Sequence, residues 1–261
     1  MLKRTMLVGL SVLLMTALIG SVSGAVLWED DFETYEDGTT TVGGGALGPN
    51  GSLLDGYTQF SRTQGRPLYA TESNAPVTGS VSPIGGGGSN DYSAYHDFGT
   101  AYSTGVFTIT SWLRAKQEGG AHSGAVGLDI PGGDTDNALA VQIRKTGNLW
   151  GIKGTHVQEP TQTSGATTGF HGWDLFRLIV DLDTLTASAV RDPNNDGDFS
   201  DATVTLSVVL DPVTIGMFGL MGNDDGGPDN VVVEWVPEPV SLSILVLGGS
   251  LIICRRRRRL V

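Results

Sequence analysis

Hydrophobic and polar positions alternate with a period of two in many short stretches of this chain. Between residues 204 and 210, Val204, Leu206, Val208 and Leu210 alternate with threonine and serine. Such alternation is typical of a strand with one buried face. No stretch of residues 26–236 keeps an apolar period of 3.6 residues for three helical turns. The pattern predicts many strands and no long helix in this region.

The predicted strands follow one another closely and are separated by glycine and proline. They cover residues 26–32, 92–98, 107–114, 124–130, 138–144, 173–183, 185–192, 204–210, 213–220 and 230–235. This number of strands in about 210 residues predicts one all-β domain of two packed antiparallel sheets over residues 26–236. The glycines at 85–88 are interpreted as a long surface loop, and a linker between two subdomains is the alternative.

The amino terminus has the pattern of a secretory signal. Lys3 and Arg4 precede an apolar stretch over residues 6–20, and small residues follow at 21–25. This order predicts a signal peptide, residues 1–25, that is cleaved near Gly24 or Ala25. A retained membrane anchor is the alternative.

The carboxyl terminus has three parts in residues 237–261. Pro237, Glu238 and Pro239 form an extended strip, because proline prevents regular helix or ladder pairing. The apolar residues 240–254 come next and would span about 23 Å as a transmembrane helix, somewhat short of the hydrocarbon core of a bilayer. Five arginines then hold that end on the cytoplasmic side; they are Arg255, Arg256, Arg257, Arg258 and Arg259.

The order of these three parts resembles the PEP-CTERM sorting signal of exported bacterial proteins. The resemblance implies processing by an exosortase, a transpeptidase-like enzyme, and transient anchoring in the membrane before processing. It also implies a final location in the cell envelope, at the outer surface or in the extracellular matrix.

Charge narrows the choice of partners. Without the two terminal segments, but with Glu238 kept, nine basic residues remain against 28 acidic ones, a net charge of −19. Such a surface repels nucleic acid and anionic lipid and attracts divalent cations, so nucleic-acid binding is excluded. The single cysteine, Cys254, lies in the tail, so the exported domain is held together without disulfides.

A second resemblance covers most of residues 26–236. It rests on the opening residues 28–33, the tryptophan-containing segment 173–183 with its continuation 185–192, and the closing residues 219–233. These segments resemble the concanavalin A-like (LamG-like) jelly roll, a sandwich of two antiparallel sheets. The resemblance implies that the first and last strands are neighbours. It also implies that the tryptophan-containing strand leads into a hairpin that ends in an acidic loop.

That acidic loop is the candidate metal site. Asp192, Asn194 and Asp196, followed by Gly197, match positions 1, 3, 5 and 6 of an EF-hand-type calcium loop. Position 12 is Thr203 and not glutamate, so the match is partial. The predicted ligands of a weak, structural Ca²⁺ site are Asp192, Asn194, Asp196, Asp198, Ser200 and Asp201. The alternative is a solvated turn, since Asp, Asn and Gly dominate turns.

Catalytic motifs find little support in the sequence. The four histidines are scattered, and no trusted strand carries the Glu-x-Asp spacing that places two carboxyl groups on one face. We therefore predict that the protein is not an enzyme.

Aromatic residues near loops are candidate sugar platforms, because a flat ring stacks on the apolar face of a pyranose. The candidates are Trp150, Tyr92, Tyr95 and Tyr102, and core packing is the alternative for Trp150. The sequence predicts an exported, non-catalytic module for adhesion that contacts polysaccharide. A structural matrix protein without a ligand site is the alternative, and a polysaccharide hydrolase or lyase is a more remote one.

Overall fold

The computed structural model describes residues 24–32, 57–61, 68–72, 81–85, 92–114, 123–128, 139–144, 149–154, 163–165, 167, 172–222 and 227–238. Val26–Trp235 form one compact unit, and Met1–Ala25 with Val236–Val261 form another. The second of these is described only at residues 24, 25 and 236–238. The predicted signal peptide and the predicted transmembrane segment 240–254 therefore lie outside the described residues, apart from residues 24 and 25 at the end of the first.

The described part of the chain is almost entirely strands. They are β1 (Ala25–Asp30), β2 (Thr58–Ser61), β3 (Leu68–Glu72), β4 (Val81–Gly85), β5 (Tyr92–Tyr102), β6 (Val106–Arg114), β7 (Ser123–Leu128), β8 (Leu139–Arg144), β9 (Leu149–Lys153), β10 (Thr163–Ser164), β11 (Trp173–Asp181), β12 (Thr186–Asp192), β13 (Thr205–Val209), β14 (Ile215–Gly222) and β15 (Gly227–Val236). A single 3₁₀ turn, η4 (Phe199–Asp201), lies between β12 and β13.

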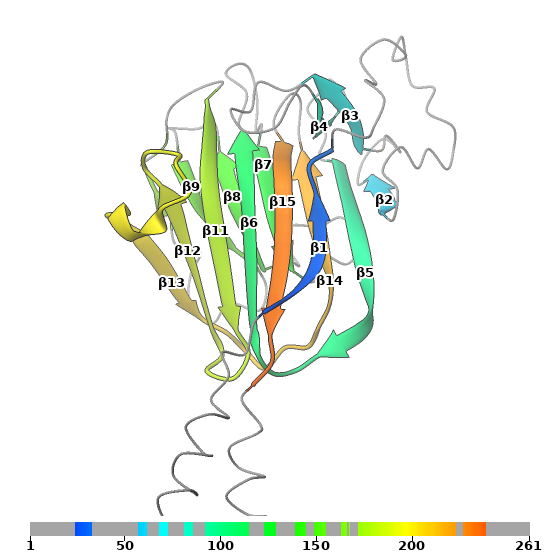
Figure 1. Ribbon diagram of the computed structural model, residues 1–261, viewed down its shortest axis with the longest axis vertical. Helices are drawn as coiled ribbons and strands as arrows, with labels where there is room; N and C mark the ends of the chain where they lie inside the picture. Colours follow the sequence, from blue (N-terminus) through cyan, green and yellow to red (C-terminus); the bar gives the residue numbers. More distant parts are fainter. Residues whose placement is uncertain are drawn as a thin grey trace, which may run out of the picture. The chain divides into compact units, whose positions relative to one another are not determined.

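Two sheets make up the sandwich (Figure 1). The first has six strands in the order β1-β15-β6-β11-β12-β13, and the second has seven in the order β10-β9-β8-β7-β14-β5-β2. Strands β3 and β4 pair separately as a hairpin. The arrows of β1, β15 and β6 run in alternating directions, so the first sheet is antiparallel at this edge too (Figure 1).

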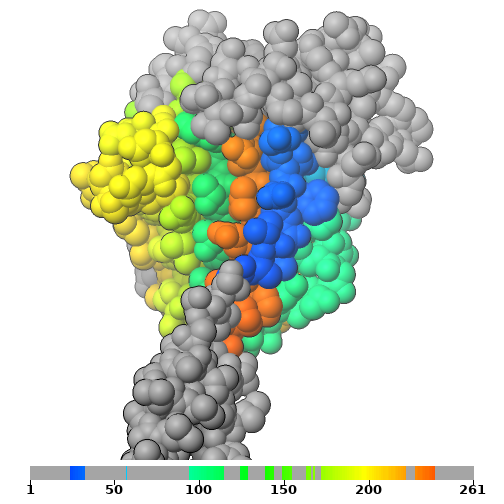
Figure 2. Space-filling view, in the orientation of Figure 1, coloured from blue at the N-terminus to red at the C-terminus, as the bar shows by residue number. Residues whose placement is uncertain are grey.

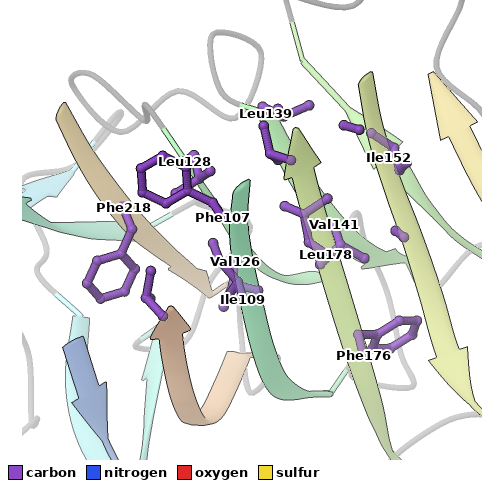
Figure 3. Packing of buried hydrophobic residues seen from close by; sticks show 14 of the residues in the cluster. Phe107, Ile109, Val126, Leu128, Leu139, Val141, Ile152, Phe176, Leu178 and Phe218 are labelled. Carbon is purple, nitrogen blue, oxygen red and sulfur yellow. The ribbon is translucent and has the colours of Figure 1, made fainter. Parts of the chain in front are cut away.

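The core follows from the period-two pattern of the strands. On β6, the inward positions carry Phe107, Ile109 and Leu113, all fully buried. Phe176 and Leu178 of β11 lie beside them and face residues such as Val126, Val141 and Phe218 of the second sheet (Figure 3). Burying a large apolar side chain contributes about 1.5–3 kcal/mol, so this interlayer is the main source of stability.

The structure confirms the prediction of two antiparallel sheets. The first and last strands, β1 and β15, are neighbours as expected, and β11 leads into β12 as a hairpin ending at Asp192. Strands β2, β3, β4, β9 and β10 were not predicted from the alternation.

Hydrogen bonds define one end of the sandwich, which we call the hairpin end. Here the Leu182 amide donates to the Gly105 carbonyl at 3.0 Å, and the Trp235 indole N–H donates to the Thr104 carbonyl at 3.1 Å. The opposite end, the acidic-loop end, contains the pairs Trp173–Arg114 and Leu175–Asp192. Eight residue steps along β6 separate the two ends by about 26 Å.

Candidate functional site

The acidic loop, residues 192–201, folds around the carboxylate of Asp192. This side chain is fully buried although it is charged. Its Oδ1 accepts from the backbone amides of Asn194 and Asn195 at 3.0 and 2.9 Å, and its Oδ2 accepts from the Gly197 amide at 2.7 Å. These three amide donors offset the cost of holding the carboxylate out of water.

Asn195 fastens the loop to the first sheet. Its Oδ1 accepts from the Leu175 amide at 3.0 Å, and its Nδ2 donates to the Trp173 carbonyl at 3.1 Å. Its φ of 58° lies in the left-handed region, which asparagine tolerates better than most residues. Asn195 was not among the predicted ligands, although the Asn-Asp-Gly sequence at residues 195–197 favours a turn with this backbone conformation.

The outer part of the loop is a series of short turns. The Asp198 amide donates to Asp196 Oδ1, and the Ser200 amide donates to Asp198 Oδ1, both at 2.9 Å. Asn194 Nδ2 also donates to Asp201 Oδ2. In Figure 2 the loop stands out as a projecting lobe at one side of the first sheet.

Two carboxyl groups of the acidic loop have pKa values shifted from their ordinary value. Partial desolvation, and then repulsion from Asp196, Asp192 and Asp198, raise the pKa of Asp201 above its ordinary value. The side-chain and backbone hydrogen bonds from Ser200 lower the pKa of Asp198. The loop therefore carries negative charge that its own hydrogen bonds only partly compensate.

The fit of this loop to Ca²⁺ is partial. All six predicted ligands lie in the same loop, and all except Asp192 are exposed. However, the described residues contain no group of three or more Asp, Glu, His or Cys side chains arranged to hold a metal ion. The Asp192 oxygens, the first of the predicted ligands, accept hydrogen bonds from backbone amides.

A small apolar cluster lies beside the acidic loop. Trp112, Trp173 and Leu175 are buried together, with Phe199 packed against them. These residues have the opposite strand parity to the main core, so they lie on the outer face of the first sheet. The Arg177 guanidinium lies 4.0 Å from the centre of the Phe199 ring, a distance suited to a cation–π contact. The loop is thus packed against the sheet as well as hydrogen-bonded to it.

The predicted sugar residues do not form one site. Trp150 is fully buried in β9, with its ring 5.3 Å from that of Phe176 in the core, so its face is not available to a ligand. Tyr95 is half-buried on the outer face of β5, whereas Tyr102 is half-buried on the inner face. The side chain of Tyr92 lies outside the described residues.

A row of aromatic rings, of which Tyr102 alone was predicted to contact sugar, lies between the edge regions of the two sheets. We call this set the aromatic row: Trp28, His96, Phe98, Tyr102 and Trp235, all of them half-buried. Successive rings are in contact, with centroid distances of 3.8, 6.0, 6.0 and 4.7 Å. The Trp28 indole N–H also donates to the Tyr57 hydroxyl at 2.8 Å.

The signal for this row was dispersed along the chain. Trp28 and Trp235 lie in the first and last strands, while β5 supplies the other three rings from same-face positions. Trp28, Phe98, Tyr102 and Trp235 also pack against the main core. The row exists because β1 and β15 are neighbours and because β5 lies opposite them in the second sheet.

Three buried aspartates of the described residues have structural partners. Asp174, fully buried, forms an ion pair with Arg191, whose side chain is 13% exposed. Asp192 accepts the amides of its own loop. Asp229 accepts the Asn230 amide at 2.8 Å. Each of these carboxylates is therefore engaged in holding the fold.

Little of the predicted sorting tail is described. Pro237 and Glu238 are half-buried, while Pro239 and the five arginines lie outside the described residues. In the described part of the chain, no helix has both the length and the apolar character needed to cross a membrane.

No family model matches this chain, and no curated protein matches it. Several solved structures show a distant likeness. A protein of unknown function from Shewanella oneidensis MR-1 has a TM-score of 0.47 at 10% identity, covering 70% of this chain and 80% of that one. Basic winged bean lectin with Tn-antigen has a TM-score of 0.44 at 9% identity, with 71% and 94% covered. The carbohydrate-binding module CBM66 from Bacillus subtilis has a TM-score of 0.41 at 15% identity, with 69% and 95% covered. Likenesses of this size assign the chain to none of these families.

Proposed function

We propose that this protein is an exported, envelope-associated β-sandwich that contacts carbohydrate without transforming it. The observation that carries the proposal is the aromatic row, five half-buried rings in succession between the edge regions of the two sheets. Export and sorting follow from the two terminal segments of the sequence.

The chemistry of the row suits a sugar. Aromatic rings with partly exposed surfaces offer apolar area for the faces of pyranose units, and polar atoms beside them fix orientation. The exposed residue Thr104 is one such neighbour, because its carbonyl accepts a hydrogen bond from the Trp235 indole N–H. Tyr57, whose hydroxyl accepts from the Trp28 indole N–H, is buried. The row follows one flank of the sandwich, so its proposed ligand is an extended chain and not a single sugar.

The non-catalytic part of the proposal is supported by what the buried carboxylates do. A retaining glycosidase needs two carboxyl groups about 5–5.5 Å apart that are free to meet the substrate. Asp174 is paired with Arg191, and Asp192 is surrounded by amides of its own loop. Carboxylates held in this way stabilise the fold and are not free to meet a substrate.

Calcium has a structural role in this proposal. The exposed oxygens of Asn194, Asp196, Asp198, Ser200 and Asp201 supply the hard ligands that Ca²⁺ prefers, and binding would relieve the repulsion around Asp201. Because Asp192 is directed to amides, the affinity should be weak, with a Kd of about 10⁻⁴–10⁻³ M. Isothermal titration with Ca²⁺ tests this part, and Mg²⁺ is the control; the absence of binding at 10⁻² M, on the order of tenfold above that range, would remove calcium from the proposal.

Binding of residues 26–236 to a panel of soluble polysaccharides tests the function. Trp28→Ala and Trp235→Ala should each weaken binding to the recognised polysaccharide at least about tenfold, which corresponds to 1.4 kcal/mol. Tyr95→Ala is the matched control, because Tyr95 lies on the opposite face of β5 and should leave the affinity unchanged. Circular dichroism would establish that each variant is folded.

Two results would contradict this proposal. Loss of binding in Tyr95→Ala, with binding retained in Trp28→Ala and Trp235→Ala, would move the site to the outer face of the second sheet. A folded domain that binds no polysaccharide would favour a structural matrix protein. That alternative has some support, because the rings of the row contact one another and residues 26–236 carry a net charge of −18.

A further inference from the structure

Carboxylates border the aromatic row on all three strands that supply its rings. In each strand an acidic residue is the direct neighbour of a ring in the sequence. These neighbours are Glu29 after Trp28 on β1, Asp97 between His96 and Phe98 on β5, and Glu234 before Trp235 on β15. Glu29 and Asp97 are exposed, and Glu234 is half-buried. Successive residues of a strand point to opposite faces, so these carboxylates lie across the backbone from the rings, within about one Debye length, roughly 10 Å at 0.1 M salt. Their negative charge therefore acts on a ligand at the row.

No fixed positive charge lies on these strands. Neither lysine nor arginine occurs in β1, β5 or β15, and their one basic side chain is that of His96. In the described part of the chain, lysine and arginine are found on other strands; they are Arg114, Arg144, Lys153, Arg177 and Arg191. Residues 26–236 as a whole carry a net charge of −18. A negative potential of this kind repels an anionic polysaccharide and attracts a cationic one.

Aromatic rings add a second attraction for a cation. A cation above the face of a ring is drawn to its π electrons, most strongly for tryptophan. The protein uses this contact elsewhere with its own arginines: the Arg177 guanidinium lies 4.0 Å from the centre of the Phe199 ring, and that of Arg114 lies 5.8 Å from the centre of the Trp173 ring. The row has a tryptophan at each end and no arginine on its own strands. An external cation would make there the contact that arginine makes elsewhere.

We propose that the ligand of the aromatic row is a cationic polysaccharide, built from amino sugars whose amines are not acetylated. This inference rests on the proposed carbohydrate contact at the row and specifies the class of its ligand. The apolar faces of the sugars pack on the rings, and the ammonium groups lie near the rings and the bordering carboxylates. A neutral polysaccharide gains the packing alone, and an acidic one is repelled.

Two oligosaccharides that differ in charge test the proposal. Both are β-1,4-linked glucosamine oligomers of equal length, one with trimethylated amines, which carry a permanent positive charge, and one with acetylated amines, which are neutral and of similar size. Their binding to the full chain is measured by isothermal titration in a non-ionic detergent without a sugar headgroup, at about pH 8, where histidine is neutral. We expect the trimethylated oligomer to bind at least about tenfold more tightly than the acetylated one. This preference should decrease as salt is added.

Charge-neutralising variants locate the attraction. Glu29→Gln and Glu234→Gln should each weaken binding of the trimethylated oligomer about two- to fivefold and leave binding of the acetylated oligomer unchanged. Asp196→Asn is the matched control, because it removes the same charge from the acidic loop and should leave both affinities unchanged. Trp28→Ala should weaken binding of both oligomers. Circular dichroism would establish that each variant is folded.

The contrary outcomes separate this inference from the proposed function. Equal or tighter binding of the acetylated oligomer, lost in Trp28→Ala, would overturn the cationic ligand and leave the carbohydrate function in place. A preference for the trimethylated oligomer that persists in Glu29→Gln, Glu234→Gln and Trp28→Ala would show attraction to the net charge alone and would also overturn the inference. A folded protein that binds neither oligomer and none of the polysaccharides in the panel would contradict the proposed function, and this inference with it.

Discussion

At the scale of single residues, buried charge is the feature with the largest consequences. Asp174 and Asp192 are fully buried, and the fold provides each with a different kind of partner. Asp174 uses the guanidinium of Arg191, whereas Asp192 uses three backbone amides. Removing either type of partner leaves polar atoms that water cannot reach, so substitutions here should be costly.

Replacement of Asp192 should destabilise the domain while preserving its fold. In Asp192→Asn, one side-chain oxygen becomes an amide group that cannot accept a hydrogen bond from Asn194, Asn195 or Gly197. The free energy of unfolding in urea should fall by about 1–3 kcal/mol. Asp196→Asn is the control: Asp196 is exposed and its Oδ1 can still accept from the Asp198 amide, so the change should stay within about 0.5 kcal/mol. Equal effects of the two substitutions would show that Asp192 does not organise the loop.

The ion pair of Asp174 and Arg191 should show strong coupling. Asp174→Leu leaves the largely buried guanidinium without its partner and should cost about 3–5 kcal/mol. The double variant Asp174→Leu/Arg191→Met should be less destabilised than Asp174→Leu alone, because no unpaired charge remains. A double-mutant cycle by chemical denaturation measures this, and additive effects would contradict it.

Ionisation of Asp201 should make the stability of the domain depend on pH. Its pKa is raised in the folded state, so its contribution to stability is present below pH 3.8, its ordinary value, and is lost as the pH rises through the folded pKa. The stability of Asp201→Asn relative to the original protein should therefore increase as the pH rises above 3.8 and stay constant once Asp201 is fully ionised in the folded state. The amide introduced by this substitution would retain an oxygen to accept from Asn194. Thermal unfolding at low salt is the measurement, and a difference that does not vary with pH would contradict this assignment.

At the scale of secondary-structure elements, close approach of neighbouring strands constrains the second sheet. A Cβ on Gly127 of β7 would come within 2.5 Å of the Leu139 carbonyl oxygen in β8. The backbones of β7 and β8 are held together by the pairs Gly127–Ala140 and Leu128–Leu139. The clash is with backbone atoms, so a side-chain rotation cannot relieve it. Glycine at this position is required by space.

Alanine substitutions at Gly127 and Gly216 should therefore change the stability of the domain in opposite directions. Gly127→Ala should lower the free energy of unfolding by about 1–3 kcal/mol through overpacking. Gly216→Ala on β14 is the matched comparison, since its Cβ would meet only the Thr100 carbonyl oxygen, at 4.0 Å. There the restriction of the unfolded chain should raise stability by about 0.4–1 kcal/mol. Urea denaturation is the measurement. An unchanged free energy of unfolding in Gly127→Ala would show that β7 and β8 can move apart.

The strands that could be predicted from sequence are those with a clear alternation. Strands β6, β11, β12 and β13 carry buried, mostly apolar residues at alternate positions, so period two identifies them, although Trp112, Trp173 and Leu175 make part of the outer face of β6 and β11 apolar as well. Strand β9 has the sequence Leu-Trp-Gly-Ile-Lys, in which Gly151 resembles a break, and Trp150 was therefore placed near a loop. Its register with β8 is what buries Trp150, and a sequence read one segment at a time does not contain that pairing.

At the scale of the whole molecule, the acidic loop and the aromatic row belong to different regions. In the first sheet, β1 and β12 are separated by β15, β6 and β11, which corresponds to about 19 Å at the usual strand spacing. Fields from an exposed loop are largely screened over that distance at physiological salt. Binding of a metal ion at the acidic loop should therefore not affect the binding of polysaccharide at the aromatic row.

This separation predicts calcium-independent binding. Polysaccharide affinity of residues 26–236 should be the same in millimolar Ca²⁺ and in chelator, and Asp196→Asn should not change it. Parallel binding isotherms in the two buffers are the measurement, with Trp235→Ala as the variant that should lose affinity in both. Affinity that rises with Ca²⁺ and is lost in Asp196→Asn would place the ligand at the acidic loop instead.

The sequence by itself determined the class of the fold and the composition of the acidic loop. Both are local properties: alternation along one strand defines its buried face, and closely spaced Asp, Asn and Gly define a turn. Tertiary structure decided which segments meet. It turned Asp192 toward amides, buried Trp150, and brought Trp28 and Trp235 into one row with β5. These outcomes depend on the order and register of strands far apart in the chain, which the pattern within each strand does not specify.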